Sequence, residues 1–232
     1  MILTSHRPVR RKPCAPFPLL VCLAALVCCC SAARADEIAV WNFNDSNLAV
    51  DHGGGSLTTT VLAANVNFSS AGTTTNARAG DPAGQGLTLQ GGTGNVNNGA
   101  SLTLNVSTAS RSNIVVSFAA LRSSTGFNSN QFQYSLDGST FVNFGSPFAP
   151  AASFALITFD LSAVAGLNNN PLAAFRIVFN GATASTGTNR LDNLVVEGAP
   201  APPSPIPEPA TLALLCAGLS GLTLAGRRRR GR

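Results

Sequence analysis

Few residues between positions 36 and 198 could carry out nucleophilic or acid–base chemistry. This segment contains one histidine, His52, which follows Asp51 and precedes three glycines, and it contains no cysteine. Hydrolysis by a serine or cysteine nucleophile needs a positioned base, usually a histidine. A single histidine beside a glycine run is typical of a solvated turn, and it falls short of the three or four ligands of a zinc site. The pattern therefore argues against both chemistries.

The carboxylates and aromatic rings of the same segment offer two other functions. Nine carboxylates are spread over it, but no two stand out by position as a pair for glycoside hydrolysis. Sugar binding commonly uses exposed tryptophan or tyrosine as a stacking surface. The segment has one of each, Trp41 and Tyr134, and both fall on the apolar side of an alternating pattern. We therefore predict that both rings belong to the core and that the segment is not an enzyme.

Short apolar stretches separated by glycine, asparagine, serine and threonine predict strands rather than helices. Phe175, Ile177 and Phe179 alternate with Arg176 and Asn180, as one buried face and one wet face require. Ten strands are predicted, at residues 38–44, 57–68, 86–90, 100–107, 113–121, 131–136, 140–144, 154–161, 173–180 and 190–197. Their number and spacing favour an all-β fold, an antiparallel β-sandwich and most readily a jelly roll.

Turns and loops separate these strands. Asp137 and Gly138 tolerate positive φ, so residues 131–144 are predicted to form a hairpin. Longer loops are predicted at residues 69–84 and 91–99, either as plain surface loops or as a binding rim.

The two ends of the β-rich segment resemble the first and last strands of carbohydrate-binding-module-like jelly rolls. The first carries Asn42, Asn44 and Asp45, and the last carries Asp192 and Asn193. In such jelly rolls these strands often close beside each other and can share a structural calcium ion, which takes several oxygen ligands. The resemblance implies a calcium site at Asp45, Asp192 and Asn193; no other cofactor is expected. The alternative is that Asp192 and Asn193 cap a strand and bond loop amides.

The charge of this segment argues against a nucleic-acid partner. Its nine carboxylates and five arginines give a net charge of −4, whereas the whole chain is formally +5. The arginines are scattered singly, at positions 78, 111, 122, 176 and 190. Nucleic-acid binding needs a clustered basic surface.

Residues 1–35 have the pattern of a secretory signal peptide. A basic stretch precedes an apolar run at residues 19–30, which is too short to span a bilayer as a stable helix. Ala33 and Ala35 place small side chains at the two positions that signal peptidase must accommodate, so cleavage is predicted before Asp36. A twin-arginine signal at positions 10 and 11 and lipidation of a nearby cysteine match the sequence less well.

The end of the chain has the layout of a sorting signal. Residues 199–205 form a proline-rich spacer, and the apolar run 210–225 is predicted to be a short transmembrane helix. Arg227, Arg228, Arg229 and Arg230 follow it and fix its orientation, because positive charge stays cytoplasmic. Ile206 and the motif of Pro207, Glu208 and Pro209 then lie just outside the inner membrane.

Residues 206–232 resemble the PEP-CTERM sorting signal of Gram-negative bacteria that produce exopolysaccharide. The motif, the short span and the arginine cluster occur in the family's order, with isoleucine where valine is most frequent. The resemblance implies processing by exosortase at Pro207, Glu208 and Pro209, after which the protein is released or attached at the cell surface. The alternative is an ordinary membrane anchor that is never cut.

The sequence supports three functions, in decreasing order. The first is a non-enzymatic cell-surface or extracellular-matrix protein associated with exopolysaccharide or biofilm. The second is a carbohydrate-binding module with a defined glycan groove, and the third is a glycan-active enzyme. All three require export across the inner membrane, with transient anchoring there before processing. The low charge, the lack of lysine after residue 35 and the many asparagine, threonine, serine and glycine residues suit a sugar-rich matrix.

Overall fold

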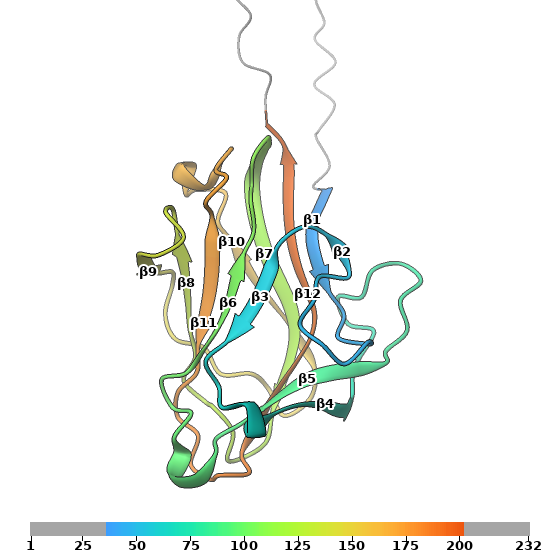
Figure 1. Cartoon of the computed structure of the whole chain (residues 1–232), viewed down its shortest axis with the longest axis vertical. Coiled ribbons are helices and arrows are strands. Elements are labelled where there is room, and N and C mark those ends of the chain that lie inside the picture. Colours follow the sequence, from blue (N-terminus) through green and yellow to red (C-terminus); the bar gives the residue numbers. More distant parts are fainter. Residues whose placement is uncertain (1–35, 202–232) are drawn as a thin grey trace, which may run out of the picture. The chain divides into compact units, whose positions relative to one another are not determined.

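The computed structural model describes residues 36–201, which fold into two antiparallel β-sheets (Figure 1). The strands are β1 (Asp36–Trp41), β2 (His52–Gly53), β3 (Ser56–Thr59), β4 (Val66–Ala71), β5 (Gln85–Gln90), β6 (Ser101–Asn105), β7 (Arg111–Arg122), β8 (Gln131–Ser135), β9 (Phe141–Asn143), β10 (Ala155–Asp160), β11 (Ala174–Val178) and β12 (Thr188–Pro200). Three 3₁₀ turns, η1 (Ala63–Asn65), η2 (Thr93–Asn95) and η3 (Ala165–Leu167), complete the described segment, which contains no α-helix. Among residues 36–201 there is no helix long and apolar enough to cross a membrane.

The order of the strands confirms the predicted all-β sandwich. The larger sheet runs β10-β7-β12-β1-β2, with β5 paired to the first part of β12 and β4 paired to β5. The smaller sheet runs β3-β6-β11-β8-β9. From β5 onward the chain crosses repeatedly between the two sheets, as Figure 1 shows. This crossing is the arrangement of a jelly roll, which packs two sheets face to face.

The space between the sheets is filled by the apolar residues that alternate along the strands. Trp41 is completely buried, as predicted, and so are Phe118, Phe132 and Phe175 from the two sheets. Aromatic rings of this size dominate the energetics of a core. A domain without disulfides depends on such packing for its stability.

The first and last strands lie side by side in the larger sheet (Figure 1). Asp36 pairs with Gly198. β12 continues to Pro200, two residues into the predicted spacer 199–205, because Ala199 is buried and pairs with Ser112 of β7. The predicted signal peptide 1–35, the rest of the spacer beyond Ala201 and the predicted helix 210–225 lie outside the described residues.

The local structure agrees with the predicted strands in most places and differs in two. The 131–144 hairpin forms as β8 and β9, with Gly138 at a φ of 76°. The predicted strand 57–68 is instead two strands, β3 and β4, in different sheets. Two side-chain bonds mark the break: Thr59 Oγ1 donates to the Ser101 carbonyl, and the Leu62 N–H donates to Asn97 Oδ1. The two-residue strand β2 was not predicted.

Candidate functional site

The segment 72–84 connects β4 to β5 and is bonded to the larger sheet. Asn76 Nδ2 donates to Ser117 Oγ of β7 (3.1 Å) and to the Asn193 carbonyl of β12 (2.8 Å). Of the predicted loop 69–84, residues 69–71 belong to β4 and the remainder is held by hydrogen bonds of this kind. We call residues 72–84 the anchored loop.

Asp192 and Asn193 hold the anchored loop in place from an irregularity in β12. Asp192 is completely buried; its Oδ2 accepts from the Thr73 N–H (2.6 Å) and its Oδ1 from the Asn193 N–H (2.8 Å). Asn193, at a φ of 48°, donates its side-chain amide to the carbonyls of Thr73 and Thr75 (2.6 and 2.9 Å). Burial raises the pKa of Asp192 to about 7, although the two N–H donors oppose this shift.

Asp192 and Asn193 bond backbone groups of the anchored loop, which is the kind of contact that the alternative to a calcium site describes. Asp45 is exposed, and its Oδ2 accepts from Asn47 Nδ2 (2.7 Å). Within residues 36–201, no three or more histidine, cysteine or acidic side chains gather as a metal site would require. Calcium binding by Asp45, Asp192 and Asn193 stays a prediction.

Chelation tests that prediction directly. Because the carboxylate oxygens of Asp192 already accept two backbone N–H groups, we expect excess EDTA to leave the melting temperature of the protein unchanged. A ligand that binds only the folded state stabilises it by mass action. A fall in Tm in EDTA that is reversed by added calcium would therefore establish the ion.

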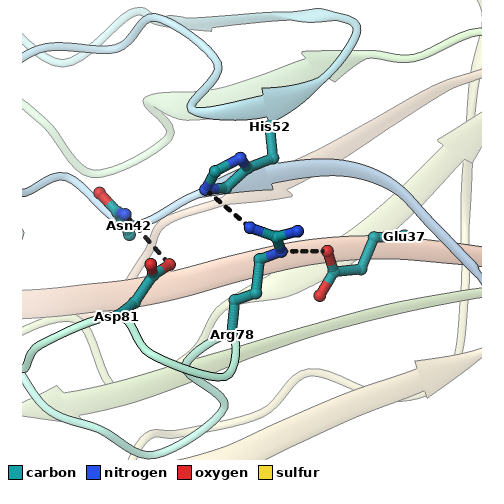
Figure 2. Close-up of polar contacts among 5 residues, drawn as sticks. All are labelled: Glu37, Asn42, His52, Arg78 and Asp81. Carbon is teal, nitrogen blue, oxygen red and sulfur yellow. Dashed lines mark hydrogen bonds and ion pairs between the residues drawn. The ribbon is translucent and has the colours of Figure 1, made fainter.

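Arg78 of the anchored loop lies between Glu37 of β1 and His52 of β2 (Figure 2). Its Nε forms an ion pair with Glu37 Oε2 at 2.9 Å, and its Nη1 lies 3.4 Å from His52 Nε2. An arginine N–H can donate to that nitrogen only while it carries no proton. Nearby, Asn42 Nδ2 donates to Asp81 Oδ2 of the same loop (3.2 Å). These contacts bind the anchored loop to the larger sheet at a second place, separate from Asp192 and Asn193.

The polar contacts around Arg78 include one member of a carboxylate pair that the sequence did not indicate. Glu37 and Glu197 are direct partners across β1 and β12, 160 positions apart in the chain. Burial, and then the charge of Glu37, raise the pKa of Glu197. A retaining or inverting glycosidase needs one protonated and one ionised carboxyl group facing the substrate. Glu37 is instead committed to Arg78, so the arrangement favours a structural role for this pair.

A groove opens beside the β8–β9 hairpin. Its volume is about 230 Å³, and it is lined by Tyr134, Leu136, Asp137, Thr140 and Val142. Tyr134 is half-buried and packs edge-on against Phe144, with ring centroids 6.3 Å apart. The prediction that Tyr134 belongs to the core therefore holds only in part, because the residue also lines the groove. Asp137 Oδ1 accepts bonds within the turn, and the N–H groups of Thr140 and Ser139 lower its pKa.

Comparison with known proteins identifies the end of the chain. A protein-family model described as the PEP-CTERM protein-sorting motif matches residues 205–230. The matched region contains Pro207, Glu208 and Pro209 and the four arginines at 227–230. The chain therefore carries a PEP-CTERM sorting motif, and a motif of this kind marks an exported protein with a membrane-anchored precursor. No curated protein sequence matches the chain.

Solved structures similar to the chain include carbohydrate-binding modules, the class that the ends of the β-rich segment resembled. The CBM22-1 xylan-binding domain of Xyn10C from Paenibacillus barcinonensis is 12% identical over 74% of this chain and 100% of that chain, with a TM-score of 0.45. Domain 4 of AbnA, a GH43 extracellular arabinanase from Geobacillus stearothermophilus, is 12% identical over 73% of this chain and 95% of that chain, with a TM-score of 0.45. The family 29 carbohydrate-binding module CBM29_1 from Piromyces equi is 9% identical over 72% of this chain and 92% of that chain, with a TM-score of 0.40.

Proposed function

We propose that the protein is a non-enzymatic component of the cell surface or extracellular matrix, where its β-sandwich associates with exopolysaccharide. The observation that carries the proposal is the PEP-CTERM sorting motif at residues 205–230. Signal peptidase would cut after Ala35, and exosortase would act at Pro207, Glu208 and Pro209. The inner membrane would hold the chain only until that second step.

The chemistry of the described domain supports a non-enzymatic role. Its single histidine, His52, has Arg78 as its polar partner rather than a serine nucleophile, and Glu37 is paired with the same arginine. Catalysis by a nucleophile would require the base within hydrogen-bond reach of it. The five arginines between residues 36 and 198 are scattered singly and form no clustered basic surface, which disfavours a nucleic-acid partner.

The fate of the tail tests the proposal. We expect the protein recovered from the host's envelope and medium to have the intact mass of a shortened chain. That chain would lack every residue after the region of Pro207, Glu208 and Pro209. Replacing these three residues by alanine should leave a chain that still ends at Arg232 and stays with the inner membrane. Pro203→Ala, outside the matched residues, should be processed normally. A wild-type chain that keeps Arg232 would make the tail a plain anchor and contradict the proposal.

A second candidate is a carbohydrate-binding module with a defined glycan groove. One observation favours it: Tyr134 is among the residues that line an open groove of about 230 Å³. Trp41, the other stacking residue available, is completely buried and therefore cannot contribute. The groove is somewhat smaller than the roughly 300–1,000 Å³ of sites that enclose drug-sized ligands. Binding of neutral dextran that is lost in Tyr134→Ala would favour this candidate over the first.

A further inference from the structure

The smaller sheet contains a single charged residue, Arg176. None of the other residues of β3, β6, β8, β9 and β11 is acidic or basic. Arg176 lies in β11, the middle strand of the five. Its neighbours Phe175 and Ile177 are buried between the sheets, so Arg176 points to the outer face.

The Arg176 guanidinium is held in a fixed orientation by neutral partners. Its Nε donates to Gln133 Oε1 (2.7 Å), and Gln133 Nε2 in turn donates to Asn143 Oδ1 (2.7 Å). Its carbon Cζ lies 3.8 Å from the centre of the Phe141 ring. Within residues 36–201 the ion pairs are those of Arg78 and Arg111, and Arg176 takes part in neither. These contacts use Nε and one face of the guanidinium, which leaves its two terminal amino groups for a ligand.

Polar side chains lie beside Arg176 in the same row across the width of the sheet. The strand register places five outward residues in one row: Thr58, Thr103, Arg176, Gln133 and Asn143. The adjacent row includes Ser56, Asn105 and Phe141. Hydroxyl and amide groups both donate and accept hydrogen bonds, as sugar hydroxyls do.

We propose that this outer face binds an acidic polysaccharide, with Arg176 pairing with the carboxylate of a uronic acid and the neighbouring row binding sugar hydroxyls. The planar guanidinium suits a carboxylate because it can donate two parallel hydrogen bonds. The inference rests on the proposed matrix function and deepens it by naming a surface and a ligand class.

An acidic polypeptide is the competing occupant, and the composition of the face disfavours it. Protein interfaces depend on a few large buried anchors, chiefly aromatic residues and arginine. The exposed large apolar residues of the described domain lie elsewhere; Val142 of β9, for example, pairs with Tyr134 on the inward side. Phe141, the one aromatic residue on the outer face, is covered by Arg176.

The experiment measures binding of the protein recovered from its host to three polymers: polygalacturonate, neutral dextran and poly-L-glutamate. We expect polygalacturonate to bind most tightly, with an affinity that falls as salt is raised. Arg176→Gln should weaken that binding by about ten- to a hundredfold, the effect of losing a charge-assisted pair. Arg111→Gln removes the same charge from an exposed ion pair on the other sheet and should bind like the wild type. Circular dichroism and the melting temperature would establish that both variants are folded.

Each other outcome overturns the inference in a distinguishable way. Unchanged polygalacturonate binding by Arg176→Gln would exclude the outer face. Preferential binding of dextran that is lost in Tyr134→Ala would place the ligand in the groove, with the matrix function intact. Tighter binding of poly-L-glutamate would indicate a protein partner. A wild type that binds none of the polymers but is recovered with the host's matrix would overturn only this inference, whereas its absence from the matrix would contradict the proposed function as well.

Discussion

Raising the pH from about 4 to about 7 is expected to lower the free energy of unfolding of the β-sandwich, because it ionises Asp192 inside the fold. Burial raises the pKa of this carboxyl group from 3.8 to about 7, so the folded state binds a proton that the unfolded chain has already released. The stabilisation is complete below the unfolded pKa and is lost as the pH rises through the folded pKa. Each pKa unit corresponds to about 1.4 kcal/mol, which sets an upper limit of about 4 kcal/mol for the loss.

Asp192→Asn should flatten this pH dependence. The variant cannot ionise, but its single amide oxygen can accept from only one of the Thr73 and Asn193 N–H groups, a loss of about 1 kcal/mol. We therefore expect the variant to be less stable than the wild type near pH 5 and at least as stable near pH 8. Urea unfolding at a series of pH values measures both curves. Parallel curves between pH 4 and 7 would contradict the assignment.

Two other carboxyl groups set the limits of that experiment. The pKa of Glu197 is also raised, first by burial and then by Glu37, so Glu197→Gln is the matched control and should keep the Asp192 part of the profile. The pKa of Asp137 is lowered by the N–H groups of Thr140 and Ser139. The ionised Asp137 contributes to the free energy of unfolding above the ordinary pKa of an aspartate, and this contribution is lost as the pH falls. Measurements below about pH 4 would therefore mix the titration of Asp137 with that of Asp192.

Most strands could be predicted because alternation is a local property of the sequence. Phe175 and Ile177 point inward and Arg176 outward, as their alternation indicates. The positions at which strands end could not be predicted in the same way. The β3 strand ends at Thr59. Three residues later the Leu62 N–H donates to Asn97, a residue 35 positions away whose side chain shows no sign of this role in the sequence.

The candidate sites depend even more on contacts between distant segments. Asp192 was singled out from its place in the last strand, but its bond to Thr73 joins residues 119 positions apart. The stacking of Arg176 on Phe141 requires the register of β11 against β8 and of β8 against β9. Alternation shows which face a residue occupies; it does not show which residues of other strands stand beside it.

Phe132→Ala is expected to be among the most destabilising single substitutions in the described domain. Phe132 is completely buried, and its ring is stacked on Phe159 of β10 with centroids 3.9 Å apart and planes 6° apart. It also meets Phe144 edge-on at 6.3 Å. Truncating a buried phenylalanine costs about 3–5 kcal/mol through lost burial and the cavity left behind. Urea denaturation at constant pH measures the change, and a loss below about 1 kcal/mol would show that the edge of the sandwich collapses around the gap.

The controls for this substitution connect the core to the proposed binding face. Leu156→Ala removes an exposed side chain from β10 and should change stability by no more than about 0.5 kcal/mol. Phe132 and Gln133 are neighbours on β8, one packed in the core and the other bonded to Arg176. Loosening β8 should therefore also disturb the orientation of Arg176 and weaken polygalacturonate binding, even at temperatures where Phe132→Ala remains folded. Unchanged affinity in a folded Phe132→Ala would mean that β11 and Phe141 hold Arg176 without help from the core beneath β8.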